Sequence, residues 1–192
     1  ETGRYLHNYA LTYALGLSQS PYFNAVQSPS YAADLTPLNE QGIYVTPAWG
    51  KNIRYELNTF KYANNLYHVK MKQGTKNTPS YGRAKEIAVG SIFEFAVLSA
   101  NIELSLPTWI RMGLWLSKAH IEWQRTTITS KSESFEQCSL PLNPLDLSNI
   151  PQTFDLISMP PSSLFDNVSL RTDWWIAEAN GNTWHIPQKL QY

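Results

Sequence analysis

The feature that most constrains this fold is the alternation of apolar and polar residues at every second position in the middle of the chain. Over residues 53–60, Ile53, Tyr55 and Leu57 alternate with polar side chains, and the pattern returns at 66–72. A period of two predicts β-strands with one face buried. Further strands are predicted at 43–45, 119–128 and 174–177, and the apolar run 92–98 predicts a strand buried on both faces.

Helical spacing is found in two places. Residues 4–17 carry apolar side chains at three- and four-residue steps, which predicts a helix capped by Thr2. A short second helix is predicted after Pro107, interrupted by Gly113. The segment 18–39 contains Pro21 and Pro29 and is predicted to be a connector.

The order of these elements predicts an α+β fold with an antiparallel sheet. With 192 residues, a single domain is expected. We expect residues 1–129 to form its core, without the strand that would precede Thr2 in a ferredoxin-like arrangement. Residues 130–192, rich in Ser, Pro and Leu, are expected to form an irregular C-terminal extension.

Composition excludes several classes of protein. The charged fraction of 16% and the hydrophobic fraction of 43% argue against disorder and against a coiled coil. Cys138 is the single cysteine, which excludes an internal disulfide and fits a cytoplasmic location. The sequence shows no transmembrane run and no export signal, so no membrane association is expected. Neither a metal nor a cofactor is expected, because His7, His68, His120 and His185 share no ligand spacing.

Charge is unevenly distributed along a chain whose net charge is zero. Residues 51–125 hold eleven Lys and Arg against five Glu, whereas residues 1–50 and 126–192 are net acidic. A basic middle between acidic ends is typical of a protein that binds a polyanion on one face and proteins on others. The high aromatic fraction of 13% also favours contact surfaces, and a permanent partner is expected.

The basic segment 70–85 predicts a β-hairpin tip, or finger, at 73–82 that contacts a nucleic-acid backbone. Cations bind phosphates, small residues allow close approach and a ring stacks on bases. The candidate RNA-binding residues are Lys70, Lys72, Lys76, Tyr81, Arg83, Lys85, Arg111 and Lys118. Further candidates for contact with RNA or a partner are Arg4, His7, Asn8, Lys51 and Arg54, the first three on the expected polar side of the first helix.

Two other function classes stay open at this point. His68 and His120, among Tyr and Lys, have the chemistry for metal-independent RNA cleavage. A carbohydrate-binding module using Trp side chains is the other, although Trp109, Trp115 and Trp123 fit a core. The common catalytic motifs are absent from the sequence.

Three segments, in the same order, resemble the Csc-one family, the Cas-five-type subunit of type I-D CRISPR Cascade complexes. They are YLHNYALTYALG at 5–16, GRAKEIA at 82–88 followed by GSIFEF at 90–95, and WIRMG at 109–113 followed by SKA at 117–119. The resemblance covers about residues 2–125. It implies a ferredoxin-like, RRM-like domain of the RAMP superfamily in which the basic hairpin is a thumb.

The resemblance also implies a function in antiviral defence. It implies a non-catalytic subunit that caps the 5′ handle of the CRISPR RNA and helps to position target DNA near the protospacer-adjacent motif (PAM). The implied partners are the CRISPR RNA, the target DNA, a Cas-ten-like large subunit and a Cas-seven-type backbone subunit. Cleavage of repeat RNA by this chain is the alternative.

Overall fold

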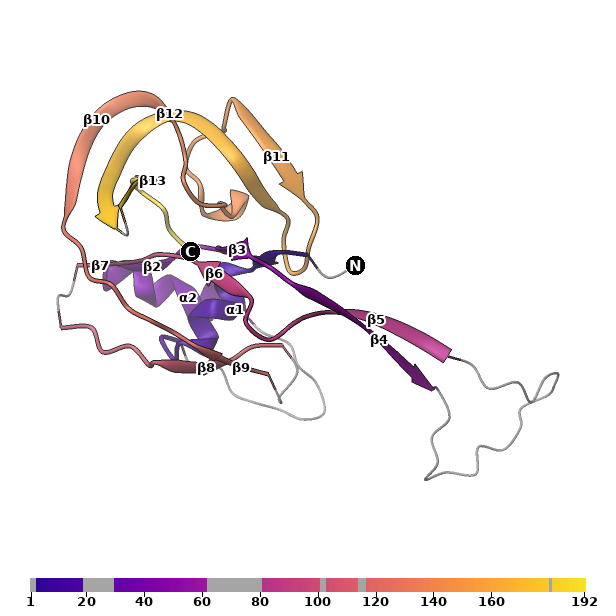
Figure 1. Cartoon of the computed structure of the whole chain (residues 1–192). Helices are drawn as coiled ribbons and strands as arrows, with labels where there is room; N and C mark the ends of the chain where they lie inside the picture. Colours follow the sequence, from indigo (N-terminus) through magenta and orange to yellow (C-terminus); the bar gives the residue numbers. More distant parts are fainter. Residues whose placement is uncertain (1–2, 19–29, 62–80, 101–102, 114–116, 180) are drawn as a thin grey trace. The chain divides into compact units, whose positions relative to one another are not determined.

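The computed structural model describes residues 3–18, 30–61, 81–100, 103–113, 117–179 and 181–192 (Figure 1). Of residues 60–61 and 81–82 it describes the backbone only. The chain divides into two compact units, which are described separately. The first unit contains Gly50–Phe93 with the segment up to Arg4, and the second contains Tyr5–Trp49 and Glu94–Tyr192. In the described residues, two α-helices and mostly antiparallel strands give the α+β class that the sequence predicts.

An antiparallel ribbon of two strands dominates the first unit. It pairs β4 (Tyr55–Lys61) with β5 (Tyr81–Ile87), and these strands run side by side in Figure 1. The strand predicted at 53–60 is thus confirmed, with its start shifted by two residues. Its predicted burial is wrong, because Tyr55 is 40% exposed and Leu57 is 64% exposed. The predicted strand 66–72 and most of the predicted finger, 73–80, lie outside the described residues.

The chain passes between the two units within β3 (Ala48–Asn52) and β6 (Ile92–Glu94). With β1 (Tyr5–Leu6) these strands form a sheet in the order β1-β3-β6. Gly50 in β3 has a steric reason to be glycine, since an added Cβ would lie 2.3 Å from Cγ1 of Ile53. The sequence pattern did not reveal β3, because a glycine and a lysine interrupt its apolar residues.

The second unit contains both helices, α1 (Asn8–Ala14) and α2 (Tyr31–Glu40). The prediction of one helix over 4–17 is wrong at its start, where β1 precedes α1. His7 is the N-cap in place of Thr2, and its Nδ1 accepts the backbone N–H of Tyr9 at 3.2 Å. The predicted connector is wrong from Tyr31 onward, because α2 forms there with Pro37 inside it. Packing of Leu35 and Leu38 against Tyr9 and Ile43 stabilises this helix despite the proline.

The second unit also contains a pair of short strands. The strand predicted at 43–45 is confirmed as β2 (Ile43–Val45), which pairs with β7 (Val97–Ser99). The single buried strand predicted at 92–98 is instead two strands, β6 and β7, and no residue of 92–98 is buried. The break is fixed by Thr46, whose Oγ1 accepts the N–H of Ala96 and whose own N–H donates to the Ala96 carbonyl.

The short helix predicted after Pro107 is wrong. The residues form a hairpin of β8 (Trp109–Arg111) and β9 (Lys118–His120). Ile110 is buried while Trp109 and Arg111 are exposed, a period of two that a three-residue stretch does not reveal in the sequence. The predicted strand 119–128 is confirmed for its first two residues, within β9, and for Ile128, where β10 begins, but residues 121–127 are not in a strand. Gly113 has a φ of 69°, in the left-handed region that favours glycine.

The expectation of an irregular C-terminal extension is also wrong. Residues 128–187 form β10 (Ile128–Gln137), the short 3₁₀ helix η1 (Pro144–Asp146), β11 (Thr153–Ile157), β12 (Leu164–Ala179) and β13 (Asn182–Pro187). The other three strands are antiparallel to β12, with β10 along one edge and β11 and β13 along the other. The strand predicted at 174–177 is confirmed within β12. Its inward side chains form a core with Cys138, Leu140, Leu142 and Ile186.

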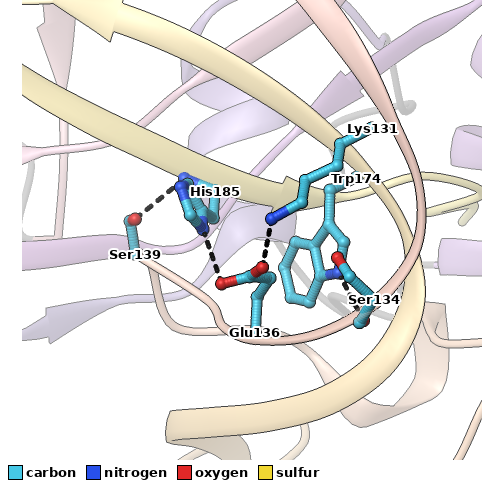
Figure 2. A network of polar contacts seen from close by, with 6 residues as sticks. All are labelled: Lys131, Ser134, Glu136, Ser139, Trp174 and His185. Carbon is cyan, nitrogen blue, oxygen red and sulfur yellow. Dashed lines mark hydrogen bonds and ion pairs between the residues drawn. The ribbon is translucent and has the colours of Figure 1, made fainter.

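A β-bulge in β10 lets the strand follow β12, which is strongly curved in Figure 1. Lys131 pairs with Trp174 and Ser134 pairs with Thr172, so β10 has one extra residue between them. Figure 2 shows how the bulge is held: the Lys131 ammonium donates to Glu136, and the Trp174 indole donates to the Ser134 carbonyl at 3.0 Å. The pKa of Glu136 is lowered, chiefly by the hydrogen bond from Lys131.

Candidate nucleic-acid interface

Charge is sorted between the two faces of the β4–β5 ribbon. Residues directly opposite in an antiparallel pair point to the same face, and successive residues point to opposite faces. The register pairs Leu57 with Lys85 and Thr59 with Arg83, so both cations share a face with Tyr55. We call Tyr55, Leu57, Thr59, Arg83 and Lys85 the ribbon's basic face. Glu56 pairs with Glu86 on the opposite face.

The basic face carries an ordered cation and ring. Nζ of Lys85 lies 4.1 Å from the centroid of the Tyr55 ring, a cation–π contact that holds the ammonium over the aromatic surface. Arg83 is exposed. The acidic face is held by Asn58, whose amide donates to Glu86 Oε2 at 2.7 Å. A polyanion therefore meets attraction on one face of the ribbon and repulsion on the other.

Other predicted RNA-binding residues are only partly described. Tyr81 begins β5, where its backbone pairs with Lys61, but its side chain is not among those described. Lys70, Lys72 and Lys76 lie outside the described residues, as does His68. In the first unit Arg4, Lys51 and Arg54 are exposed. The backbone of Arg54 is fixed by Ser91, whose Oγ accepts its N–H at 3.1 Å.

A second basic surface lies on the β8–β9 hairpin in the other unit. The register pairs Trp109 with His120 and Arg111 with Lys118, which places all four on one face. We call these four residues the hairpin face, and all four are exposed. Ile110 lies on the other side of the hairpin and is 6% exposed. The sequence singled out Arg111 and Lys118 but not Trp109, which was expected in the core and is 61% exposed.

His7 and Asn8 are buried, so the expectation that they lie on a polar, contact-forming side of the first helix is wrong. They belong to a polar cluster around Asp146 of η1. The Asp146 carboxylate accepts hydrogen bonds from Asn8 at 2.7 Å, Tyr44 at 2.8 Å and Tyr9 at 3.0 Å. Asn143 adds a fourth at 3.2 Å. Four donors around one buried carboxylate explain why these polar residues face inward.

Burial shifts the pKa values of Asp146 and His7 in this cluster. Desolvation raises the pKa of Asp146 to about 6, against the lowering effect of its hydrogen bonds. Desolvation lowers the pKa of His7 to about 4. The two groups are connected, since His7 Nε2 lies 2.9 Å from Ser162 Oγ, which donates to Asn143 Oδ1 at 3.2 Å. These hydrogen bonds thus join the start of α1 to η1, which indicates a structural role for the cluster.

The side chains of Figure 2 include a Ser, a His and a Glu, but their geometry is not that of a nucleophile with its base. Ser139 Oγ accepts the backbone N–H of His185 at 2.9 Å, so this contact does not involve the imidazole. The His185 ring instead faces Glu136, with Nδ1 3.6 Å from Oε2. A base must contact the hydroxyl proton that it removes. Desolvation raises the pKa of buried Cys138 to about 12, which keeps its thiol protonated.

The described residues include neither a cluster of metal ligands nor a helix that could span a membrane. These residues contain no group of three or more His, Cys, Asp or Glu arranged to hold a metal ion. None of the helices in the described part of the chain has the length and apolar character needed to span a bilayer.

The structure defines an α+β protein that presents cations beside aromatic rings on two strand pairs. The family model for the type I-D CRISPR-associated protein Cas5/Csc1 matches residues 1–192, and the chain belongs to this family. It is therefore a Cas5/Csc1 subunit of a type I-D CRISPR system, and Cas5 membership implies a place in a Cascade complex with CRISPR RNA. No curated protein matches the sequence.

Proposed function

We propose that this subunit binds the CRISPR RNA without cleaving it, caps the 5′ handle and helps the large subunit to position target DNA near the PAM. The charge sorting of the β4–β5 ribbon carries this proposal. Arg83, Lys85 and the Tyr55 ring share one face, and Glu56 and Glu86 share the other. Cations beside an exposed ring suit backbone contact with a single-stranded RNA end.

The ribbon and the segment 126–192 support the other parts of the proposal, the thumb and the contacts with partner proteins. A ribbon with one basic face suits a thumb that lies along RNA, in keeping with the ferredoxin-like RAMP domain that the family resemblance implies. The segment 126–192 has a net negative charge and carries exposed apolar side chains, including Ile150 and Leu156. Such a surface suits contact with the Cas-ten-like large subunit and the Cas-seven-type backbone subunit.

The test is reconstitution of the Cascade complex with its CRISPR RNA and the double variant Arg83→Ala/Lys85→Ala. We expect the variant to retain less RNA. Each lost phosphate contact on a single strand reduces the slope of log K against log salt concentration by about 0.7, so the two lost contacts should reduce it by about 1.4. Glu56→Ala/Glu86→Ala on the opposite face is the matched control and is expected to retain RNA. Equal RNA retention and equal salt dependence in the basic-face variant and the wild type would contradict the proposal.

The non-catalytic part of the proposal has its own test. Repeat RNA is incubated with the purified chain in EDTA, with His120→Ala and His68→Ala as variants. We expect intact RNA throughout. Specific cleavage by the wild type that disappears in the His variants would establish the endoribonuclease instead.

A further inference from the structure

The hairpin face brings an exposed indole and two cations together. The Trp109 and His120 ring centroids lie 4.8 Å apart with an angle of 49° between the ring planes. Arg111 and Lys118 are paired on the same face. Two cations at directly opposed positions give this face a positive charge, which attracts a phosphate.

The other side of the hairpin holds this face in place. Ile110 and Ile121 are buried, and the Ile121 N–H donates to the Thr108 carbonyl at 2.8 Å. Beyond the hairpin, Trp123 donates its indole N–H to the Pro107 carbonyl at 2.9 Å. The Trp109 ring is thus presented to solvent from an anchored strand, which is the requirement for a preformed stacking surface.

We infer that the hairpin face is a stacking site for an unpaired base of a single-stranded nucleic acid, with Trp109 under the base and Arg111 and Lys118 at the adjacent phosphate. His120 is in tilted ring contact with Trp109. This inference extends the proposed function, on which it rests, from phosphate contacts at the ribbon to a base contact in the second unit. RNA and DNA strands share the chemistry that the site recognises.

Charge favours a nucleic acid over a protein as the occupant. The four residues include two permanent cations and no carboxylate. A carboxylate nearby is that of Glu122, which is 91% exposed and lies 4.0 Å from His120 Nδ1. A protein-binding face would be expected to surround an exposed Trp with further apolar side chains. Here its neighbours on the face are His, Arg and Lys.

The experiment measures binding of the full chain to fluorescent oligouridine RNA and oligothymidine DNA of about 12 nucleotides, within the usual range of single-strand sites. Trp109→Ala is expected to weaken binding on the order of tenfold with an unchanged salt dependence, because stacking is not ionic. Trp109→Phe is expected to restore part of the affinity. Arg111→Ala/Lys118→Ala is expected to reduce the slope of log K against log salt concentration by about 0.7, because one phosphate contact on a single strand is lost.

The controls separate this site from its alternatives. Phe135→Ala removes an aromatic side chain of similar exposure, 55%, in the same unit and is expected to bind as the wild type. The RNA and DNA probes show which strand binds more tightly, and a duplex probe should not respond to Trp109→Ala, because its bases are already stacked.

Two outcomes would overturn the inference. In the first, Trp109→Ala binds both single strands as tightly as the wild type, while Arg83→Ala/Lys85→Ala still weakens RNA binding. This result would leave the proposed function intact. The other is unchanged nucleic-acid affinity of Trp109→Ala with failure of Cascade assembly on size-exclusion chromatography, which would make this face a protein contact. Unaltered binding in the ribbon variant would count against the proposed function alone.

Discussion

Glu56 and Glu86 lie directly opposite each other in the β4–β5 ribbon. Two carboxylates at opposed positions destabilise an antiparallel pair. Their placement also leaves the opposite face with Arg83, Lys85 and Tyr55 and no carboxylate among its described side chains. The ribbon is therefore polarised, with one face that attracts a polyanion and one that repels it.

Reversing the acidic face should remove this polarity. Glu56→Lys/Glu86→Lys makes both faces basic, so we expect tighter binding to unrelated RNA and a steeper dependence on salt, by about 0.7 in log K for each new phosphate contact. Filter binding to repeat RNA and to a scrambled RNA measures both. An unchanged affinity for the scrambled RNA would show that the acidic face does not limit non-specific binding.

Asp146 should be among the residues most important for stability. Asp146→Asn replaces one acceptor oxygen by an NH₂ group that faces donors from Asn8, Tyr9, Tyr44 and Asn143. Loss of buried acceptors should lower the free energy of unfolding by about 2 to 4 kcal/mol. Urea denaturation measures the change. Glu40→Asn, at an exposed carboxylate, is the control, and a decrease of similar size there would contradict the assignment.

His7 and Asp146 should give stability opposite dependences on pH. The pKa of His7 is about 4 in the fold against 6.5 ordinarily, so its contribution is present above pH 6.5 and is lost as the pH falls toward 4. The pKa of Asp146 is about 6 against 3.8 ordinarily, so its contribution is present below pH 3.8 and is lost as the pH rises toward 6. Between about pH 4 and 6 the two largely cancel.

Single variants should expose each dependence. In His7→Asn, which retains a side-chain acceptor for the helix cap, unfolding free energy should fall as the pH rises from about 4 to 6. In Asp146→Asn it should fall as the pH drops from about 6.5 to 4. Each slope is at most about 1.4 kcal/mol per pH unit. Urea denaturation across this pH range measures both slopes. Slopes of the same sign in the two variants would contradict the opposite pH dependences of His7 and Asp146.

Asn167 should affect stability through its backbone conformation. It adopts a φ of 51° at the register shift between β11 and β12, and its side chain donates to Asp155 Oδ2 at 2.6 Å. Asn167→Ala should be less stable than Asn167→Gly by about 1 kcal/mol, because only glycine adopts this conformation without strain. Thermal melts of the two variants give the comparison. Equal melting temperatures would show that the backbone conformation is not limiting.

The Tyr192 hydroxyl should stabilise the second unit. It lies 2.7 Å from Thr12 Oγ1 and accepts the Val45 N–H at 2.9 Å. Tyr192→Phe leaves a buried backbone donor without its acceptor, which should cost about 1 to 3 kcal/mol of unfolding free energy. Chemical denaturation tests this, with exposed Tyr55→Phe as the control. No difference between the two variants would mean that water or another group replaces the hydroxyl.

Parts of the fold could be predicted because their signal is local. A short apolar run identified β2, alternation identified β4, and the motif at 5–16 belongs to a segment in which α1 does form. In β12, Val168, Leu170, Thr172 and Trp174 also alternate with exposed or half-buried residues, a signal that was present but not used. By contrast, α2 contains Pro37 and forms because Leu35 and Leu38 pack against distant residues, which no local pattern reveals.

The candidate site was predictable to a similar degree. Arg83, Lys85, Arg111 and Lys118 were identified from charge, but Trp109 was expected inside and His7 and Asn8 outside. The sequence by itself determined the α+β class, the basic middle and the family motifs, because these depend on residue types and short spacings. Only the tertiary structure decided that Glu56 opposes Glu86, that Trp109 faces solvent and that Asn8 reaches Asp146. Periodicity shows which residues share a face, whereas strand register and long-range packing decide what that face meets.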